Sequence, residues 1–415
     1  MEFEVKILKQ WKIMSINYKE LADKYGTPFY AYDFSHITTQ YNTLKDAFKA
    51  RKSIIAYAVK ANSNLSVIKH LANLGSGADC VSIGEVKRAL KAGVPNYKVM
   101  FSGVGKIDDE IKAALELGIL MINVESYAEL ERIEVIAKEL DKVARISVRV
   151  NPNIDPKTHP YISTGLHENK FGVDVNTAKR IYIKCKNSDN LDPQGIHLHI
   201  GSQLTQLQPI LESVDIVADL VRNLHALEIE LKFFDVGGGL GIIYDNEVLI
   251  DTNEYAQGIL KSLFGLDITI ICEPGRSLVG NSGTFVTKVL YEKINGEKRF
   301  VIVDGAMNDL IRPALYNASH KLEVIDRSEN VSDCNLVGPI CESGDFFAKN
   351  IPLPATQHND LIAIYSAGAY CFTMASNYNT RTRVAEIAIE NGEDRLIRRR
   401  ETFDDLIAHE EEFLK

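Results

Sequence analysis

The chain has 415 residues, of which 45% are hydrophobic and 25% charged, and its net charge is −9. This length exceeds what one ordinary hydrophobic core organises, so the composition predicts a globular protein of two domains. The acidic balance argues against a nucleic acid or an anionic membrane as partner, and no apolar run reaches the roughly 18 residues that span a bilayer.

The start of the chain and the spacing of its cysteines together predict a protein of a reducing compartment. The opening stretch MEFEVKILKQWKI contains acidic side chains and no signal-peptide core, which favours a cytoplasmic protein. The six cysteines have no paired spacing, so we expect neither a disulfide framework nor a metal site.

Residues 53 to about 275 alternate short β-branched runs with amphipathic helical stretches. Patterns such as DDEIKAALELG (108–118) and SYAELERIEVIAKEL (126–140) repeat apolar residues at helical spacing. Eight strands alternating with helices over about 220 residues predict a TIM (β/α)8 barrel, with an open doubly wound sheet as the alternative. The strand candidates are SIIAYAVK (53–60), GADCVS (77–82), KVMFSG (98–103), ILMINV (119–124), RISVRVN (145–151), GIHLHIG (195–201), KFFDVGGG (232–239) and ITIICEPG (268–275).

After residue 280 strand-like runs follow one another without helices between them, which predicts an all-β domain, either a β-sandwich or a Greek-key β-barrel. The run TPFYAYD (27–33) is also strand-like and is expected to join this domain. The expected division is an N-terminal segment at 1–40, the barrel at 41–280 and the β domain at 281–415. The strand candidates are TFVTKVLYEK (284–293), KRFVIVDGAM (298–307), NLVGPICES (335–343), LIAIYSAGAY (361–370) and TRVAEIAIENG (382–392).

Several chemically active side chains follow the strand candidates, and TIM-barrel active sites lie at the carboxyl ends of the strands. Each has a simpler structural explanation, since a strand-end lysine is often only solvated and a glycine run often only a turn. Their convergence on one rim predicts a single site. They are Lys60, Asp79, His199, Ser202, Gly237, Gly238, Gly239, Glu273 and Arg276.

The glycine run 237–239 lacks both the last glycine of a dinucleotide fingerprint and the Gly-Lys-Ser/Thr of a P-loop. A nest of backbone N–H groups that suits a single phosphate remains, and Arg276 can add a positive charge to the same anion. One phosphate, one lysine and one buried acid together indicate pyridoxal phosphate. In such enzymes a lysine forms a Schiff base with the cofactor and an acid pairs with its pyridine nitrogen.

Six ordered motifs, which are YAVKAN, HLHIGSQ, DVGGGLG, CEPGR, CESGD and GAY, resemble the fold-type III pyridoxal-phosphate decarboxylases, the alanine-racemase-like group. The segments THPYISTG, NKFG and AMNDLIRPALY narrow the resemblance to the diaminopimelate decarboxylase family. It covers nearly the whole chain, from about Tyr18 to Val384. It implies decarboxylation of meso-2,6-diaminopimelate to L-lysine, the last step of lysine biosynthesis.

The resemblance also implies roles for single residues. Lys60 would carry the cofactor, His199 would stack on the pyridine ring and Asp79 would lie near the phenolic oxygen. Glu273 on the pyridine nitrogen favours a decarboxylase, because racemases of this fold place an arginine there and so weaken the electron sink. The remaining cofactor-binding residues would be Ser202, Gly237, Gly238, Gly239, Pro274, Gly275, Arg276 and Tyr370.

The resemblance further implies which residue returns a proton to the product and which residues bind the substrate. Cys341 would return a proton after CO2 leaves, since a thiol is largely protonated at pH 7, although a small core thiol is the commoner fate of a cysteine. Arg276 and Arg312 would pair with carboxylates, and Glu342 would take the distal ammonium group. Tyr316, four residues after Arg312, and Tyr370 complete the expected substrate-binding set.

The family pattern implies a homodimer in which Cys341 and Glu342 come from the partner subunit. The sequence leaves three alternatives to this function open. The first is a related decarboxylase that acts on arginine, ornithine or carboxynorspermidine. The second is a cofactor-carrying protein without turnover, and the third is a barrel that binds no cofactor.

Overall fold

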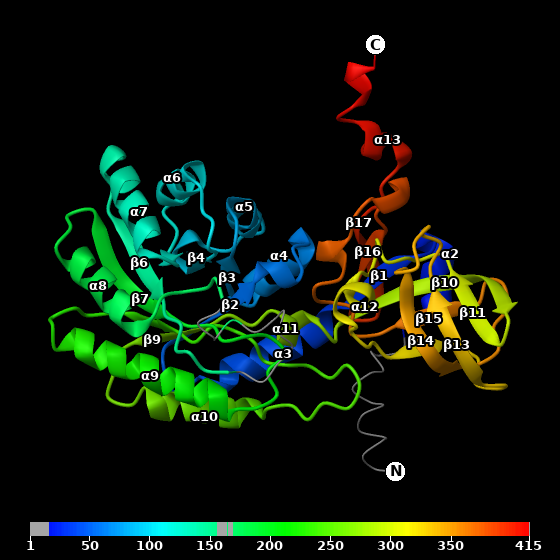
Figure 1. The fold of residues 1–415 in the computed structure, drawn as a ribbon, viewed down its shortest axis with the longest axis horizontal. Helices are drawn as coiled ribbons and strands as arrows, with labels where there is room; N and C mark the ends of the chain where they lie inside the picture. Colours follow the sequence, from blue (N-terminus) through cyan, green and yellow to red (C-terminus); the bar gives the residue numbers. More distant parts are fainter. Residues whose placement is uncertain (1–15, 156–163, 165–168, 415) are drawn as a thin grey trace. The chain divides into compact units, whose positions relative to one another are not determined.

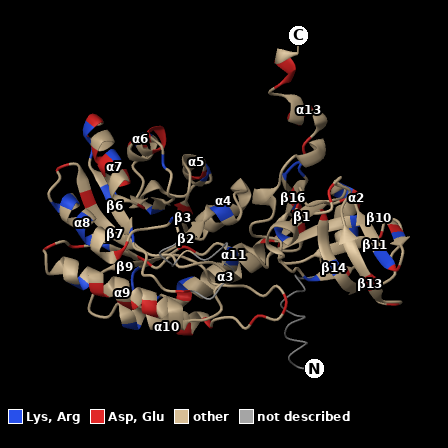
Figure 2. Ribbon diagram, in the orientation of Figure 1, with Lys and Arg blue, Asp and Glu red and all other residues tan. Residues whose placement is uncertain are grey.

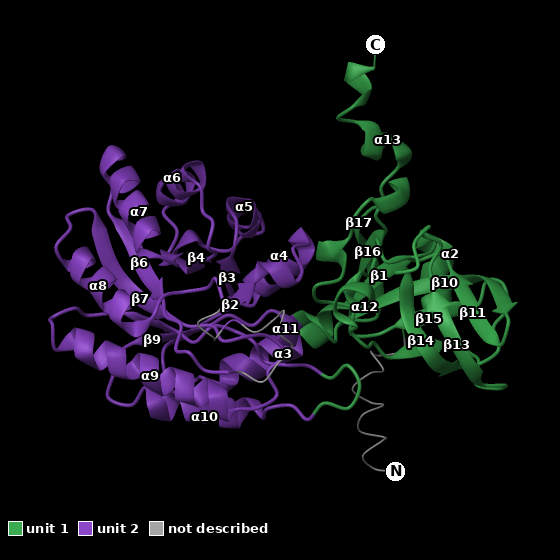
Figure 3. Ribbon diagram, in the orientation of Figure 1, with its two compact units in different colours: residues 1–37, 243–247, 279–415 green, residues 38–242, 248–278 purple. Residues whose placement is uncertain are grey.

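The computed structural model describes residues 16–155, 164 and 169–414. Expectations for residues 1–15 and for most of the THPYISTG motif lie outside this range. The chain forms two compact units (Figure 3). The β unit comprises Met1–Ile37, Ile243–Glu247 and Val279–Lys415, and the barrel unit comprises Thr38–Ile242 and Val248–Leu278.

The barrel unit is a closed barrel of eight parallel strands that follow one another in chain order (Figure 1). The TIM-barrel prediction is therefore confirmed, and the doubly wound alternative is excluded because β2 pairs with both β3 and β9. The strands are β2 (Ser53–Ala58), β3 (Gly77–Cys80), β4 (Val99–Phe101), β5 (Met121–Val124), β6 (Ala144–Arg149), β7 (Leu191–His197), β8 (Phe233–Asp235) and β9 (Thr269–Cys272).

Capping residues mark the ends of several helices of the barrel unit. Ser126 Oγ accepts a hydrogen bond from the Glu129 amide at 3.1 Å and so caps the start of α7 (Tyr127–Glu139). Gly118 adopts a left-handed conformation that ends α6 (Asp108–Leu117). The other helices are α3 (Phe34–Ala47), α4 (Leu65–Asn73), α5 (Ile83–Lys91), α8 (Val175–Lys186), α9 (Gln208–His225), α10 (Thr252–Ser262) and α11 (Arg276–Val279).

Each barrel helix buries one apolar face, and α7 does so with Leu130, Ile133 and Ile136. Burying a side chain of this size stabilises the fold by about 1.5–3 kcal/mol. Basic and acidic residues are interspersed along α7, α8 and α9 (Figure 2). Among the described helices, none combines the length and the apolar character that crossing a bilayer requires.

The β unit contains one nine-stranded sheet, whose main path runs β14-β13-β11-β10-β1-β16-β17. The run TPFYAYD contains β1, which in this unit pairs with β10 antiparallel and with β16 parallel. The strands are β1 (Phe29–Asp33), β10 (Gly283–Asn295), β11 (Lys298–Val303), β12 (Leu322–Val324), β13 (Ser332–Val337), β14 (Phe346–Leu353), β15 (Leu361–Ile364), β16 (Ala385–Glu390) and β17 (Glu393–Arg398). The helices are α2 (Tyr18–Tyr25), α12 (Arg312–Tyr316) and α13 (Phe403–Ile407).

Candidate active site

Lys60 lies one turn beyond β2, in the short 3-10 helix Val59–Ala61. Its Nζ atom is 3.9 Å from Oδ2 of Asp79, which is buried near the end of β3. The other oxygen of Asp79 accepts a hydrogen bond from Ser102 Oγ at 2.8 Å, and Asn123 donates to that hydroxyl at 2.9 Å. Burial raises the pKa of Asp79 to about 6, with the charge of Glu273 adding to the rise and Lys60 opposing it.

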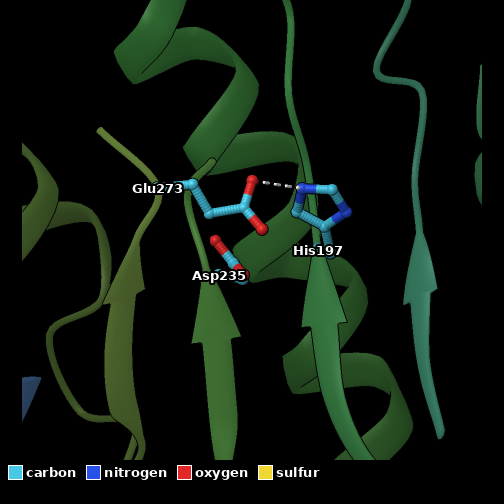
Figure 4. A group of neighbouring side chains, drawn as sticks. All are labelled: His197, Asp235 and Glu273. Atoms are coloured by element: carbon cyan, nitrogen blue, oxygen red, sulfur yellow. Dashed lines mark hydrogen bonds and ion pairs between the residues drawn. The ribbon is translucent and has the colours of Figure 1, made fainter. Parts of the chain in front are cut away.

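Glu273 follows β9 directly and meets two side chains from neighbouring strand ends (Figure 4). Its Oε2 atom is 3.2 Å from Nε2 of His197, the last residue of β7. Asp235, the last residue of β8, lies beside the Glu273 carboxylate. All three side chains are buried, and their polar atoms lie within 4.8 Å of one another.

The environment of this trio assigns different charges to its two carboxyl groups. Burial and the nearby Glu273 raise the pKa of Asp235 well above its ordinary value, so Asp235 keeps its proton. Burial alone also raises the pKa of Glu273. The charge and hydrogen bond of His197, with a contribution from Lys60, nevertheless hold that pKa below the usual range. Glu273 is therefore the anion of the pair.

The sequence alone does not identify His197 and Asp235 as site residues. Both stand at a strand end, which is the signal that identifies Lys60 and Glu273, and they lie inside the motifs HLHIGSQ and DVGGGLG. In these motifs the sequence predicts roles for His199 and for the glycines instead. Only the closed barrel shows that β7, β8 and β9 are adjacent and that their last residues meet.

His199 lies two residues beyond the end of β7 and is half-buried. Its Nδ1 atom accepts a hydrogen bond from the Gly238 amide at 3.2 Å, which places the ring proton on Nε2. Burial, with the charges of Lys60 and Arg149, lowers the pKa of His199 well below its ordinary value. The imidazole is therefore neutral and held by its edge, as a ring that stacks on an aromatic cofactor requires.

The glycine run 237–239 packs against the loops that follow β7 and β9 more closely than any side chain would allow. A Cβ atom on Gly238 would lie 2.1 Å from the Glu273 carbonyl oxygen, and one on Gly237 would lie 2.3 Å from that of Leu198. Gly239 has a φ of +110°. A backbone loop of this kind presents amide groups to an anion without steric obstruction.

Arg276, which begins α11, is buried and donates a hydrogen bond from Nη2 to Ser202 Oγ at 2.9 Å. The preceding Pro274 carbonyl accepts the amide of Ala58 at 3.1 Å, so the EPGR loop is attached to the strand that carries Lys60. Arg276 and Ser202 thus supply a guanidinium group and a hydroxyl group suited to a phosphate.

These residues fit pyridoxal phosphate. Apart from the Asp235 carboxyl, the buried Oε1 atom of Glu273 has no hydrogen-bond partner among the described residues, so it can accept the N–H of a pyridinium ring. The glycine loop would be obstructed by any Cβ atom, and Lys60 stands beside a buried acid. The barrel unit thus offers a partner for each polar part of this cofactor.

The other expected residues belong to the β unit. Arg312 and Tyr316 lie on one short helix, α12, as the four-residue spacing predicted. Cys341 is exposed, which excludes a core thiol, and its amide donates to Asn379 Oδ1 at 3.1 Å. The neighbouring Glu342 forms a hydrogen bond with Tyr378 and raises the pKa of that tyrosine. Tyr370 has a φ of +57°, a backbone conformation uncommon for a residue with a side chain.

Comparisons with known proteins place this geometry in a family. The model of the pyridoxal-dependent decarboxylases, pyridoxal binding domain, matches residues 34–280. A diaminopimelate decarboxylase from Campylobacter jejuni is 60% identical over 401 residues, which are 96% of this chain and 100% of the relative.

Two solved structures are also similar. The diaminopimelate decarboxylase from Helicobacter pylori, complexed with L-lysine, is 56% identical with a TM-score of 0.94, covering 96% of this chain and 100% of that one. The enzyme from M. jannaschii, also with L-lysine, is 38% identical with a TM-score of 0.90 over 94% and 93% of the two chains. The chain therefore belongs to the diaminopimelate decarboxylase family of the pyridoxal-dependent decarboxylases.

Proposed function

We propose that this protein is a carboxy-lyase that converts meso-2,6-diaminopimelate to L-lysine and CO2 with pyridoxal phosphate, the last step of lysine biosynthesis. The observation that carries the proposal is Glu273, a buried carboxylate kept anionic at the mouth of the barrel. Similarity to relatives named diaminopimelate decarboxylase supports the choice of substrate.

The cofactor, when bound, supplies an electron sink for the electron pair left on the α-carbon as CO2 departs. Glu273 would accept a hydrogen bond from the pyridine nitrogen and so keep it protonated. Lys60 would hold the cofactor, and the neutral ring of His199 would lie against its ring. In this proposal Asp79 lies near the phenolic oxygen.

We assign the phosphate to groups of the barrel unit. Those groups are the backbone of the glycine run 237–239, the hydroxyl of Ser202 and the guanidinium of Arg276, with Pro274 and Gly275 shaping the loop. Tyr370 of the β unit adds a hydroxyl to this set. We assign cofactor binding to residues 41–280, and substrate selection to residues 281–415 with the segment 1–40.

Substrate selection requires both a cation and an anion, because the distal end of diaminopimelate carries a carboxylate and an ammonium group. We assign the carboxylate to Arg312, with Tyr316, Tyr370 and Arg276 as further contacts, and the ammonium to Glu342. Ornithine and arginine lack a distal carboxylate, so a buried arginine discriminates against them.

We assign the return of the proton to Cys341, whose exposed thiol is accessible to a ligand. In our proposal the enzyme is a cytoplasmic homodimer in which Cys341 and Glu342 complete the active site of the partner subunit. All six cysteines are free thiols, as a reducing compartment favours.

Replacement of the cofactor lysine tests the assignment. Lys60→Ala is expected to abolish turnover of meso-diaminopimelate and the visible absorbance of lysine-bound cofactor, whereas Lys91→Ala, an exposed position on α5, leaves both unchanged.

The choice of substrate is tested on the wild-type protein, for which kcat/KM for ornithine and for arginine should be at least about 100-fold lower than for diaminopimelate. Unchanged absorbance in Lys60→Ala would contradict the lysine assignment, and preferred turnover of ornithine would contradict the substrate.

A further inference from the structure

Arg312 is a buried cation held on two sides within the β unit. Only 6% of the residue is exposed. Its guanidinium carbon lies 4.5 Å from the centre of the Tyr244 ring, and its Nη1 atom is 2.9 Å from Nε2 of His320. The Tyr244 and His320 rings meet edge to face, with centroids 5.3 Å apart.

The two hydrogen bonds of His320 fix its tautomer. The arginine can only donate, so Nε2 of His320 must carry the lone pair. The Tyr365 carbonyl can only accept, so Nδ1, at 2.8 Å from that oxygen, must carry the proton. His320 is therefore neutral, and it presents an acceptor to Arg312 rather than a second positive charge.

Strand pairing determines the position of the His320 ring. His320 stands two residues before β12, and Tyr365 follows β15 directly, and these two strands pair with Leu322 opposite Ile364. The Tyr365 amide donates to the Lys321 carbonyl at 2.9 Å, which continues the pairing up to the histidine. The backbone that carries the imidazole is thus held by strand pairing, and the ring is held by the Tyr365 carbonyl.

Among the residues that the structure describes, Arg312 has no acidic partner of the kind that a buried charge normally has. Over the described part of the chain it forms no ion pair, and its two identified contacts, a neutral imidazole and an aromatic ring, leave its positive charge uncompensated. An uncompensated buried charge is costly, so an anionic ligand is the natural counter-ion. Among the described residues the guanidinium makes this one hydrogen bond, from Nη1 to His320, so its other N–H groups can bind a carboxylate.

We propose that His320 is a positioning residue that orients Arg312 and thereby sets the affinity for the carboxylate that the substrate retains. This inference rests on the proposed function, which assigns that carboxylate to Arg312. Diaminopimelate loses CO2 from its D centre, because the product L-lysine keeps the L centre with its carboxylate. L-lysine is therefore a ligand that carries the group in question, and cadaverine is a matched ligand that lacks it.

Two substitutions separate the two hydrogen bonds of His320. His320→Asn keeps a donor near Nδ1 for the Tyr365 carbonyl but has no atom at the position of Nε2. His320→Gln places an amide oxygen near Nε2 and keeps an acceptor for Arg312. The inhibition constants of L-lysine and of cadaverine are measured for the holoenzyme of each variant, together with kcat and KM for diaminopimelate.

We expect His320→Asn to weaken inhibition by L-lysine about tenfold or more, because a hydrogen bond to a charged group is lost. Inhibition by cadaverine should change less than about twofold, and KM should rise while kcat and cofactor occupancy stay near wild type. His320→Gln should restore most of the affinity for L-lysine. If His320→Asn does not fold, as judged by its melting curve, His320→Ala removes the same acceptor and serves in its place.

Arg312→Leu distinguishes failure of this inference from failure of the proposed function. If Arg312→Leu loses affinity for L-lysine and a folded His320→Asn or His320→Ala does not, the role of His320 is overturned and that of Arg312 stands. Equal losses for L-lysine and cadaverine in His320→Asn would also overturn it, because they indicate a general structural defect. If Arg312→Leu binds L-lysine as wild type does, another residue reads the carboxylate, and the assignment of Arg312 fails.

Discussion

At the scale of single residues, three buried carboxyl groups at the carboxyl end of the barrel differ in pKa because their neighbours differ. Asp235 is protonated, Glu273 is anionic, and burial brings the pKa of Asp79 to about 6. The cause is the sequence of strand ends around the barrel, since His197 stands beside Glu273 and Lys60 stands beside Asp79. Burial and the charge of Glu273 both favour the protonated form of the two aspartates.

The raised pKa of Asp79 predicts that the difference in unfolding free energy between wild type and Asp79→Asn depends on pH. In the folded protein this pKa is about 6, against 3.8 for the ordinary group, so the folded state retains a proton that the unfolded state releases first. Stability due to this proton is present below about pH 4 and is lost as pH rises through 6. Asp79→Asn, which keeps an acceptor for Ser102, should therefore become more stable relative to wild type by up to about 3 kcal/mol across this range.

Urea unfolding of the cofactor-free protein at several pH values between about 4 and 7 measures this difference. Ser102→Ala is a useful companion, because it removes the hydrogen bond without changing the titrating group. A difference between Asp79→Asn and wild type that stays constant with pH would show that Asp79 titrates normally.

At the scale of elements, the glycine run 237–239 decides how closely the loops after β7, β8 and β9 approach one another. Gly238→Ala would place a Cβ atom 2.1 Å from the backbone oxygen of Glu273, and backbone cannot rotate aside as a flexible side chain does. We expect a loss of about 1–3 kcal/mol in the free energy of unfolding and a weaker affinity for pyridoxal phosphate.

Gly105→Ala is the matched control, because a Cβ atom there meets nothing within 4 Å. Its stability should stay within about 0.5 kcal/mol of wild type. Denaturant unfolding and titration of the cofactor-free protein with pyridoxal phosphate measure both effects. Wild-type values for Gly238→Ala would mean that the loops can separate without cost.

At the scale of the whole molecule, the proposed homodimer shares its active sites between subunits. Lys60→Ala and Cys341→Ala are each expected to be nearly inactive alone. When they are mixed under conditions of subunit exchange, a heterodimer with shared sites has one site with both defects and one with neither. Random pairing makes half of the dimers mixed, so about a quarter of wild-type activity should return.

The control for this experiment is a proof of exchange, for example by differently tagged subunits recovered in one complex. Recovery of about a quarter of the activity supports shared sites. If exchange is demonstrated and activity stays at the level of the single variants, Lys60 and Cys341 serve a site within one chain.

The barrel and the residues that follow its strands could be predicted from the sequence alone. Each of the eight runs carries enough β-branched and apolar residues to form a strand that is buried on both faces, and the helices between them have an amphipathic period with capping residues. A barrel directs the carboxyl end of every strand to the same rim, so Lys60, Asp79 and Glu273 could be grouped before any contact was known.

Other features depended on the tertiary structure. The strands β14 and β17 end the main path of the sheet. The sequence FFAKNIPL of β14 contains a lysine and a proline, and EDRLIR of β17 is mostly charged, as edge strands allow, so neither has an alternating strand pattern. The strand β12 has three residues and depends on its partner β15. His197, Asp235 and His320 gained their importance from neighbours that are distant in the chain. Protonation and side-chain orientation follow from such neighbours, whereas strand and helix patterns are local properties of the sequence.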